Sequence, residues 1–496
     1  MKNNPLVTMS FIALALGGWA PTSANAQLSV ASPFTDNAVL QQGMPVPVWG
    51  NADPATDVTV EFAGQKKSCK ANSDGRWQIE LDDLKASFVP EVMTVASSTT
   101  GQTLSIKNVL VGEVWICSGQ SNMQWPHHRI PEIKALIPSV KNLRQFTVKQ
   151  TVAFTEQDRC GGQWKVQHPD SAVAFAFAYF LEESADVPVG IVQSCWGSSS
   201  IEGWMPRDMT EKLPHFKKIM QEFDADKEKR AKIESILNGP KPWGRPNDIY
   251  LRKQSNILYN AMMHPLAPMA CRGIAWYQGE SNAKPGEPML QYGRTLQAWI
   301  QRYREQWGRD DLHFMVVMLP GFAKGLEGER AARPDQRSWA PMRESQLKVL
   351  ELPYTSVANT IDLGHPTNIH PSDKLPVGKR LALLAAHDTL GQEILASGPV
   401  MTQVNSKPDR LIVHFDHATG LKTKDGKAPT GFWLADGSEK WFKADAKING
   451  ETVELSSSKV AEPKFVRYAF AGKPIVNLVN EADLPAYPFR TDQLDP

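Results

Sequence analysis

The chain has 496 residues, of which 42% are apolar and 22% charged, so it is long enough for two or three domains with sizeable cores. Its formal net charge of only +1 disfavours binding to nucleic acid, because no strong positive field is available to hold a polyanion. Its five cysteines show no C-x-x-C or His-rich spacing, and the sequence therefore predicts no metal site.

Residues 1–26 have the pattern of a signal peptide. Lys2 gives a positive start, Phe11–Ala20 is apolar, and Ala24–Ala26 is a small-x-small cleavage site. The apolar run is shorter than the roughly 20 residues that span a bilayer, and no later run approaches that length. We expect a mature protein that begins near Gln27 and is exported to the periplasm or the extracellular space, without insertion into a membrane.

Residues 27–108 are predicted to form a small β-sandwich. Short runs of alternating apolar and polar side chains are separated by turn signals such as Asn72-Ser-Asp-Gly75. The clearest runs are Val58–Phe62, Trp77–Leu81 and Met93–Ser97. This spacing is typical of an all-β module.

Residues 109–396 are predicted to form a three-layer α/β domain with a parallel sheet. Apolar runs too continuous for half-exposed strands alternate there with helical stretches. The expected strands are Val109–Cys117, Val187–Ser194, Gly273–Tyr277, His313–Leu319 and Thr355–Asp362. The expected helices include Ser171–Glu183, Lys217–Leu237, Leu290–Trp307 and Lys374–Leu390.

Residues 397–496 return to short strands separated by Gly, Asp and Asn turns. The expected strands are Leu411–Phe415, Gly431–Leu434, Thr452–Leu455 and Phe465–Phe470. This stretch is predicted to be a second β module, which could pack with the first one.

Polar groups follow four of the predicted parallel strands at the point where each strand ends. They are Gly119-Gln-Ser-Asn122, Trp196–Ser200, Gln278–Asn282 and His365–Pro371. Ligands of parallel α/β sheets sit at the carboxyl ends of the strands, so these groups are expected to meet at one edge. This edge would then hold a serine, a glycine turn, an asparagine and a histidine. Their convergence indicates a functional site.

The residue types match the needs of ester hydrolysis. A serine hydroxyl attacking an ester needs a base, and a neutral histidine is suited to that role near pH 7. The backbone N–H groups of Ser121 and Gly197 and the side-chain amide of Asn282 could donate to the oxyanion. Ser281 is an alternative nucleophile, because Gly279–Asn282 repeats the G-x-S-N pattern of Gly119–Asn122.

The order GQSNM, WGSS, WYQGESN and IHP along the chain resembles the SGNH hydrolase superfamily, and most closely the sialate O-acetylesterase group of carbohydrate esterases. Further stretches fit that group: PFTDNAVLQQGMPVPVWG, DGRW, LYNAMMHPL, VGKRLA and PFRTD. The resemblance implies an SGNH-type α/β fold and an esterase that needs no metal or organic cofactor. It also implies Ser121 as nucleophile, His370 as base, and Gly197 and Asn282 as oxyanion donors.

One position departs from the superfamily pattern. Many members carry Asp three residues before the histidine, whereas this chain has Thr367 there. His370 could then be oriented by a backbone carbonyl, by Asn368, or by Asp362 at the end of the fifth predicted strand. We predict Asp362 as the third catalytic residue.

The expected substrate is an acetylated carbohydrate, with sialic acid named by the resemblance alone. Xylan or another acetylated polysaccharide is the nearest alternative. A non-catalytic carbohydrate-binding protein is an alternative of another class, given two β modules and 15 tryptophans. The residues predicted to contact the substrate are Gln120, Asn122, Gln278, Glu280 and Arg343, and His127, His128 and Arg129 could line the same site.

Overall fold

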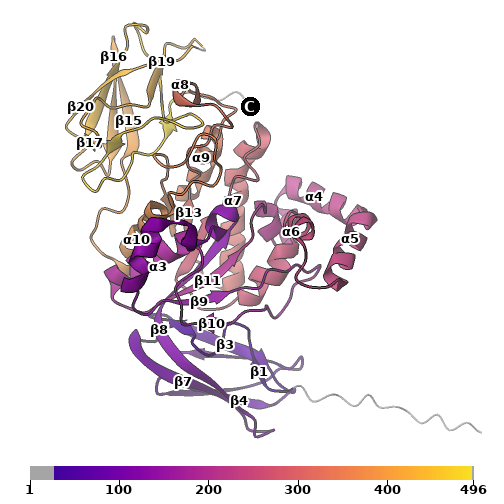
Figure 1. Ribbon diagram of the computed structural model, residues 1–496. Helices are drawn as coiled ribbons and strands as arrows, with labels where there is room; N and C mark the ends of the chain where they lie inside the picture. The colour runs from indigo at the N-terminus through magenta and orange to yellow at the C-terminus, as the bar shows by residue number, and fades with distance from the viewer. Residues whose placement is uncertain (1–26, 439, 494–496) are drawn as a thin grey trace, which may run out of the picture.

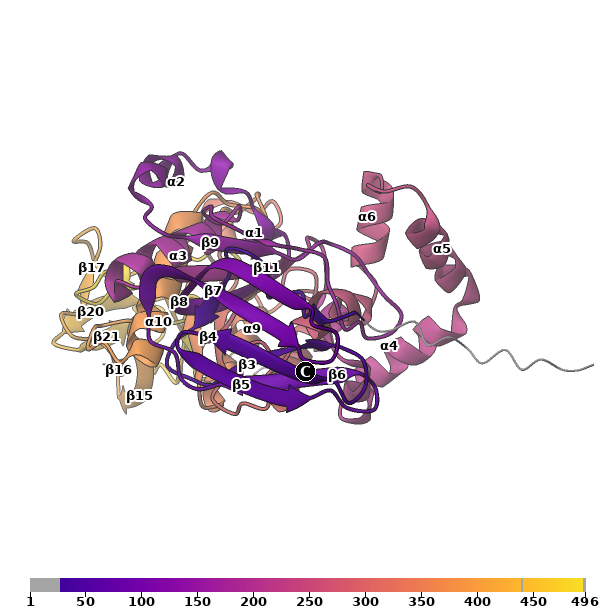
Figure 2. The ribbon, with the colours of Figure 1, turned by 90° about the horizontal axis from the view of Figure 1, so that it is seen from below.

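The computed structural model describes residues 27–438 and 440–493, and the predicted signal peptide lies outside them. Figure 1 shows a β module from the N-terminal part at one end of the molecule, an α/β body in the middle, and a C-terminal β module at the other end. Figure 2, seen from below, shows the N-terminal module in front of the α/β body. The expectation that these modules could pack together is therefore wrong, because the α/β body separates them.

The N-terminal module is a sandwich of two sheets, as predicted. One sheet contains β1 (Ser29–Val30), β3 (Val46–Asn51) and β6 (Arg76–Leu81). The other contains β4 (Asp57–Phe62), β5 (Gln65–Lys70), β7 (Ser87–Ser97) and part of β8 (Thr103–Gly119). Alternate residues of β3 and β6 are buried, which is the period-two pattern of a strand with one face in a core.

The 17-residue strand β8 joins the sandwich to the central sheet. Its first half pairs with β7 in antiparallel fashion, and beyond residue 109 it pairs in parallel with β2 (Val39–Gln41), β11 (Val189–Cys195) and β12 (Gly273–Tyr277). The predicted start of the α/β domain at residue 109 thus lies within one continuous strand.

The central sheet has the strand order β10-β9-β11-β8-β12-β13-β14. Neighbouring strands are parallel except for β10, which pairs with β9 in antiparallel fashion. The strands not yet given bounds are β9 (Arg144–Thr147), β10 (Trp164–Lys165), β13 (His313–Val317) and β14 (Thr355–Ala358). The five predicted strands are present. β9 was not predicted, since it is short and half polar, and β14 ends four residues before Asp362.

Helices cover both faces of the central sheet. α3 (Ala172–Ala185) packs against α10 (Lys374–Leu390) on one face, and α7 (Glu287–Trp307) packs against α9 (Ala340–Leu347) on the other. The predicted helix Lys217–Leu237 is divided into α4 (Pro214–Ala225) and α5 (Lys227–Asn238). The remaining α-helices are α1 (Ser121–Gln124), α2 (Pro131–Leu136), α6 (Arg245–Arg252) and α8 (Gly328–Ala331).

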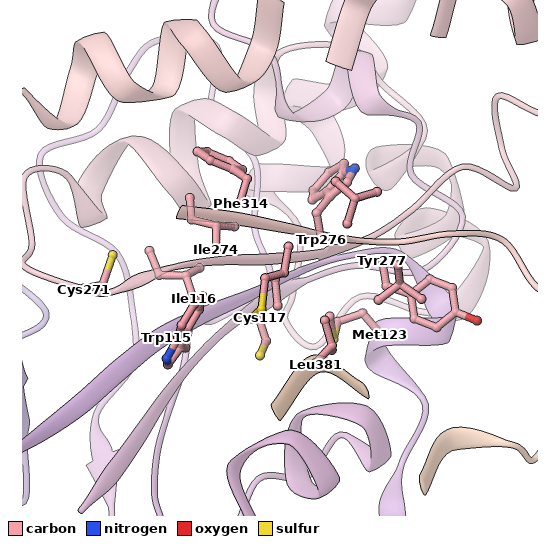
Figure 3. Close-up of a cluster of buried hydrophobic side chains, with 14 of the residues drawn as sticks. Trp115, Ile116, Cys117, Met123, Cys271, Ile274, Trp276, Tyr277, Phe314 and Leu381 are labelled. Atoms are coloured by element: carbon pink, nitrogen blue, oxygen red, sulfur yellow. The ribbon is translucent and has the colours of Figure 1, made fainter. Parts of the chain in front are cut away.

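The core lies on both sides of the sheet, where successive strand residues point to opposite faces (Figure 3). Trp276 of β12 packs on Trp299 of α7, with ring centroids 4.6 Å apart. Trp115 of β8 packs edge-on against Phe177 of α3 at 5.3 Å. The sheet is therefore anchored on each face, which fixes the positions of its strand ends.

The C-terminal module contains three small antiparallel sheets. Their strands are β15 (Val400–Lys407), β16 (Arg410–Asp416), β17 (Lys422–Thr423), β18 (Phe432–Ala435), β19 (Phe442–Lys443), β20 (Asp445–Asn449), β21 (Thr452–Ser456), β22 (Phe465–Tyr468), β23 (Leu478–Val479) and β24 (Phe489–Arg490). Together with the N-terminal sandwich, they confirm the predicted α/β body flanked by β modules.

Within residues 27–438 and 440–493, no helix has the length and apolarity needed to cross a membrane. In the same part of the chain, no three His, Cys, Asp or Glu side chains gather as a metal site would require. All five cysteines are free thiols.

Candidate active site

Ser121 follows a sharp turn at the carboxyl end of β8. Gly119 makes this turn with φ of +134°, and a Cβ at that position would lie 2.2 Å from Tyr277 O, so only glycine fits. The Gln120 N–H donates to Tyr277 O at 3.0 Å and ties the turn to β12. Ser121 then begins α1, so its hydroxyl is presented at the edge of the sheet.

His370 approaches Ser121 from the loop between β14 and α10. Its Nε2 lies 2.8 Å from Ser121 Oγ, and the neutral ring protonated on Nδ1 accepts the serine hydroxyl proton there. The imidazole stacks on the Trp125 ring at 5.0 Å with the planes 17° apart. The structure thus brings together the predicted nucleophile and base, and Trp125 fixes the plane of the base.

The two histidines of the loop have different roles. His365 Nδ1 accepts hydrogen bonds from the backbone N–H groups of Thr367 and Asn368 at 3.2 and 3.1 Å, so this ring holds the loop's own turn. The side-chain oxygen Oδ1 of Asn368 accepts the backbone N–H of His370 at 2.9 Å. Asn368 therefore orients the backbone of His370 and not its ring.

The surroundings of His370 favour the neutral form that a base requires. Burial lowers the pKa of His370 below its usual 6.5, and the positive charge of Lys374 lowers it further. Near pH 7 the imidazole is therefore mostly unprotonated and can accept a proton.

Asp362 does not orient His370, so its prediction as third catalytic residue is wrong. Its two oxygens accept from the Arg380 guanidinium at 2.8 and 2.9 Å, and Lys424 donates to it at 2.9 Å. No carboxylate hydrogen-bonds to His370 in the described part of the chain. The physical reason is that β14 ends early, which places Asp362 in a turn facing α10 and the C-terminal module.

Replacing Asp362 by Asn is expected to change stability far more than catalysis. Burial raises the pKa of this carboxyl, but Arg380 and Lys424 outweigh burial and bring it to about 2, below the unfolded value of 3.8. The ionised group therefore stabilises the fold above about pH 4 by roughly 2 kcal/mol, and this is lost as the pH falls through 2. Denaturant unfolding of Asp362→Asn at pH 7 should show this loss of stability, and its kcat should stay within about tenfold of the parent. A larger fall in kcat would show that Asp362 takes part in catalysis after all.

Gly197 lies directly against the nucleophile, as an oxyanion donor must. A Cβ on Gly197 would be 3.2 Å from the Ser121 Cβ. Its N–H donates to the side-chain oxygen of Gln124 at 2.8 Å. An ester oxygen can accept from Gly197 only after the Gln124 side chain rotates away.

Asn282, the other predicted oxyanion donor, also has a protein acceptor. Its amide nitrogen donates to the two Glu202 oxygens at 3.0 and 3.1 Å, and its oxygen accepts from Ile201 N–H at 3.1 Å. The backbone of Ser121 itself lies at the start of α1, where Gln120 makes no side-chain capping bond. Of the three predicted donors, Gly197 is thus placed against Ser121, and the N–H of Gly197 and the amide of Asn282 are both already hydrogen-bonded within the protein.

Removing the Gln124 side chain is expected to ease entry of the ester. In the parent, the Gly197 N–H must give up its hydrogen bond to Gln124, worth about 1 kcal/mol, before it can donate to the ester. Gln124→Ala removes this cost and should raise kcat/KM by about fivefold. Steady-state rates with p-nitrophenyl acetate measure this. A fall of tenfold or more would instead show that the Gln124 amide assists the reaction.

Gln278 is not free to contact a substrate, contrary to prediction, and Gln120 is held through its side-chain oxygen. Both are buried, and the Gln278 amide nitrogen donates to Gln120 Oε1 at 3.2 Å and to Asn282 Oδ1 at 2.9 Å. The Gln120 oxygen also accepts the backbone N–H of Ser281 at 3.2 Å. These two glutamines tie the turn after β8 to the turn after β12.

Asn122 and Glu280 are likewise turned into the protein. Asn122 is 1% exposed, and its amide donates to Glu280 Oε1 at 2.5 Å. The second oxygen of Glu280, Oε2, is shielded from solvent and has no hydrogen-bond partner among the described residues. The predicted substrate contacts of both residues are therefore wrong, because each is engaged beneath the Ser–His pair.

Arg343 is also wrong as a substrate-binding residue. It is fully buried, and its guanidinium donates to four backbone carbonyls between 2.7 and 3.0 Å away. The carbonyls belong to Leu319, Pro320, Ala471 and Gly472. Arg343 thus joins the end of β13 to the C-terminal module.

Four residues at the site were not predicted: Trp125, Gln124, Glu202 and Lys374. Trp125 and Gln124 follow the nucleophile motif within one helical turn, and Lys374 follows His370 by four residues, so proximity to a motif was the available signal. Of the three candidates that could line the site, His127 and His128 follow α1, and exposed Arg129 lies with its guanidinium 5.0 Å from the Trp125 ring centroid.

Comparisons with known proteins identify relatives of this chain. A family model described as a carbohydrate esterase, sialic acid-specific acetylesterase, matches residues 243–386. Sialate O-acetylesterases of Pongo abelii and Homo sapiens are each 26% identical to this chain over an alignment of 464 residues. The alignment covers 86% of this chain and 84% of each relative. The crystal structure of a carbohydrate acetylesterase from Xanthomonas citri is 34% identical, has a TM-score of 0.79, and aligns over 94% of this chain and 100% of its own.

The fold and these relatives define the chain as a carboxylic ester hydrolase. Within that class it belongs to the carbohydrate acetylesterases, and its sequence is similar to those of sialate O-acetylesterases. The alternative of a non-catalytic carbohydrate-binding protein is thereby rejected.

Proposed function

We propose that the protein is an exported esterase that removes O-acetyl groups from sialic acids through an acetyl-Ser121 intermediate. The observation that carries the mechanism is the 2.8 Å approach of His370 Nε2 to Ser121 Oγ. The proposal of export rests on the N-terminal sequence pattern and places the enzyme in the periplasm or outside the cell.

The first step transfers the acetyl group to the serine. Ser121 Oγ attacks the acetyl carbonyl carbon while His370 Nε2 takes the hydroxyl proton. The electron pair of the carbonyl moves to its oxygen, which accepts from the Gly197 N–H once Gln124 has moved. The intermediate collapses, and the sugar oxygen leaves with the proton held by His370.

The second step returns the serine. His370 takes a proton from water, the hydroxyl attacks acetyl-Ser121, and the same donors stabilise the second oxyanion. Acetate leaves, and Ser121 Oγ recovers the proton. These steps use only side chains and backbone of this chain together with water.

Two observations support an acidic sugar as the substrate. The family model and the mammalian relatives carry sialic acid in their descriptions. In addition, the exposed Arg129 guanidinium lies 5.0 Å from the centroid of the Trp125 ring, and Trp125 stacks on His370. A positive charge is therefore available one ring away from the base. A guanidinium binds a carboxylate through paired hydrogen bonds, and sialic acid carries a carboxylate.

The experiment is acetate release from a panel of acetylated sialosides, acetylated xylan and other acetylated glycans. The proposal predicts the highest kcat/KM for the sialosides, and a lower value for them in Arg129→Ala. Preference for acetylated xylan or another neutral glycan would contradict the sialic acid assignment and favour a polysaccharide acetylesterase.

The rate is expected to fall in acid because protonated His370 cannot act as base. Since burial and Lys374 hold its pKa below 6.5, kcat/KM should be level near neutral pH and decline with a midpoint below about 6.5. The measurement is a kcat/KM profile with p-nitrophenyl acetate across acid and neutral pH. A profile without any acid decline would contradict His370 as base.

A further inference from the structure

Beneath Ser121 and His370, one asparagine connects the chain on both sides of their hydrogen bond. Asn122 follows the nucleophile directly, and its amide nitrogen donates to the carbonyl of Ile369, the residue before His370, at 3.1 Å. The same nitrogen donates to Glu280 Oε1, and its oxygen accepts from Lys374 Nζ at 2.6 Å. The separation of Ser121 from His370 therefore depends on how this amide is held.

The amide can be held in only one orientation. An ammonium group only donates and an ionised carboxylate only accepts, so Lys374 must face the Asn122 oxygen and Glu280 the Asn122 nitrogen. The three groups come from three separate elements: α1, the turn after β12, and the first turn of α10. The two charged groups, one on each side of the amide, thus ensure that the Asn122 nitrogen, and not its oxygen, points at the Ile369 carbonyl.

We propose that Lys374 and Glu280, bridged by Asn122, are positioning residues that hold His370 on Ser121 and replace the missing third member of the catalytic triad. This proposal rests on the function proposed for Ser121 and His370. It accounts for a histidine that has no carboxylate partner in the described chain, because the loop that carries the ring is fixed instead.

The charges of Lys374 and Glu280 are both buried, and burial disfavours the charged form of each. Lys374 is fully buried, and burial brings its pKa down to about 8, although Glu280 and Asp373 act in the opposite direction. Burial raises the pKa of Glu280, against its hydrogen bond from Asn122 and the charge of Lys374. Removing one member of a buried ionic pair leaves the other uncompensated, so the two residues are expected to depend on each other.

The titratable groups that face this pair come from the loop of His370, from β12 and from α7, where burial, helped by the charge of Glu280, raises the pKa of Tyr292. His370 and Asp373 lie on the loop before α10, and the Asp373 carboxylate accepts Gly364 N–H at 2.8 Å. From β12, the buried Tyr277 ring lies 5.4 Å from Lys374 Nζ. Because Lys374 opposes protonation of His370, removing its charge should make His370 easier to protonate.

The first test uses the isosteric variant Asn122→Asp. It keeps an acceptor for Lys374 but loses the donor to Ile369 and Glu280, so kcat for p-nitrophenyl acetate should fall by roughly 100-fold through misplacement of His370, with KM little changed. Thermal unfolding checks that the variant is folded. A folded Asn122→Asp variant with kcat within threefold of the parent would overturn the proposal.

The second test removes the charges singly and together. Glu280→Gln and Lys374→Met should each lower kcat, and the double variant should retain more activity than the product of the single effects predicts. Lys374→Met should also move the acid limb of kcat/KM to higher pH, because the Lys374 charge no longer opposes protonation of His370. Lys379→Met, an exposed position on the same helix, is the matched control and should leave the profile unchanged.

Multiplicative single effects together with an unmoved acid limb would overturn the positioning role. That outcome is distinct from failure of the proposed mechanism. If Ser121→Ala and His370→Ala are inactive while the three positioning variants behave like the parent, only the present inference fails. If Ser121→Ala is active, the mechanism itself fails and the inference with it.

Discussion

Ser121→Ala is expected to lower kcat by about 10⁶-fold, the loss seen when the nucleophile of a Ser–His hydrolase is removed. The reason is that Ser121 Oγ is the atom that lies 2.8 Å from His370 Nε2 and directly beside Gly197. Without it, no acetyl-enzyme can form, and only weak assistance from the oxyanion donors remains. Acetate release and p-nitrophenyl acetate turnover both measure this loss.

Ser281→Ala is the matched control for that variant. Ser281 also follows a buried strand in a G-x-S-N turn, but its backbone N–H is tied to Gln120 at 3.2 Å, and the His370 ring is hydrogen-bonded to the other serine. Its kcat should stay within about tenfold of the parent. If Ser281→Ala were inactive and Ser121→Ala active, the nucleophile would be Ser281 and not Ser121.

His370→Ala is expected to have the second large effect, again a fall in kcat of about 10⁶-fold, because a base and its nucleophile act as one unit. The loop itself offers no substitute, since its other histidine, His365, is engaged by the backbone of Thr367 and Asn368. The double variant Ser121→Ala/His370→Ala should be no slower than either single variant.

His365→Ala is the control for the histidine loop. It should lower kcat through loosening of the turn, but far less than His370→Ala does. Imidazole added to His370→Ala should restore part of the rate, because the space left beside Trp125 accepts a ring of that size. A His370→Ala variant within tenfold of the parent would contradict the assignment of the base.

The parts of the fold that could be predicted are those fixed by local pattern. Continuous apolar runs such as Gly273–Tyr277 are buried on both faces and leave little alternative to a parallel strand. Ser121, Gly197, Asn282 and His370 could be found because the sheet edge gathers whatever follows its strands. β9 escaped because its four residues carry no such run.

The partners of charged side chains could not be predicted, because they come from distant parts of the chain. Asp362 was expected to serve His370, yet its partners Arg380 and Lys424 lie on α10 and in the C-terminal module. Arg343 was expected to contact the substrate, yet it is buried against Ala471 and Gly472. Which cation reaches which carboxylate is decided by the packing of the layers and not by the local sequence.

The same limit explains the residues assigned to substrate binding. Gln120, Asn122 and Gln278 lie beside the motifs and are polar, which made a substrate contact a reasonable expectation. The Gln120 and Gln278 side chains instead bind each other and the turns that carry Ser121 and Asn282, and the Asn122 amide binds Glu280 and the Ile369 carbonyl. Polar residues next to a catalytic motif in this fold hold the turns together, and the motif serine and histidine face the edge.

The central claim is that the acetyl group passes through Ser121. The most direct measurement is mass spectrometry of the enzyme quenched in acid during turnover of p-nitrophenyl acetate, followed by peptide mapping. The account predicts an acetyl adduct on Ser121, lost in Ser121→Ala and retained in Ser281→Ala. An adduct on Ser281, or an adduct that persists in Ser121→Ala, would contradict it.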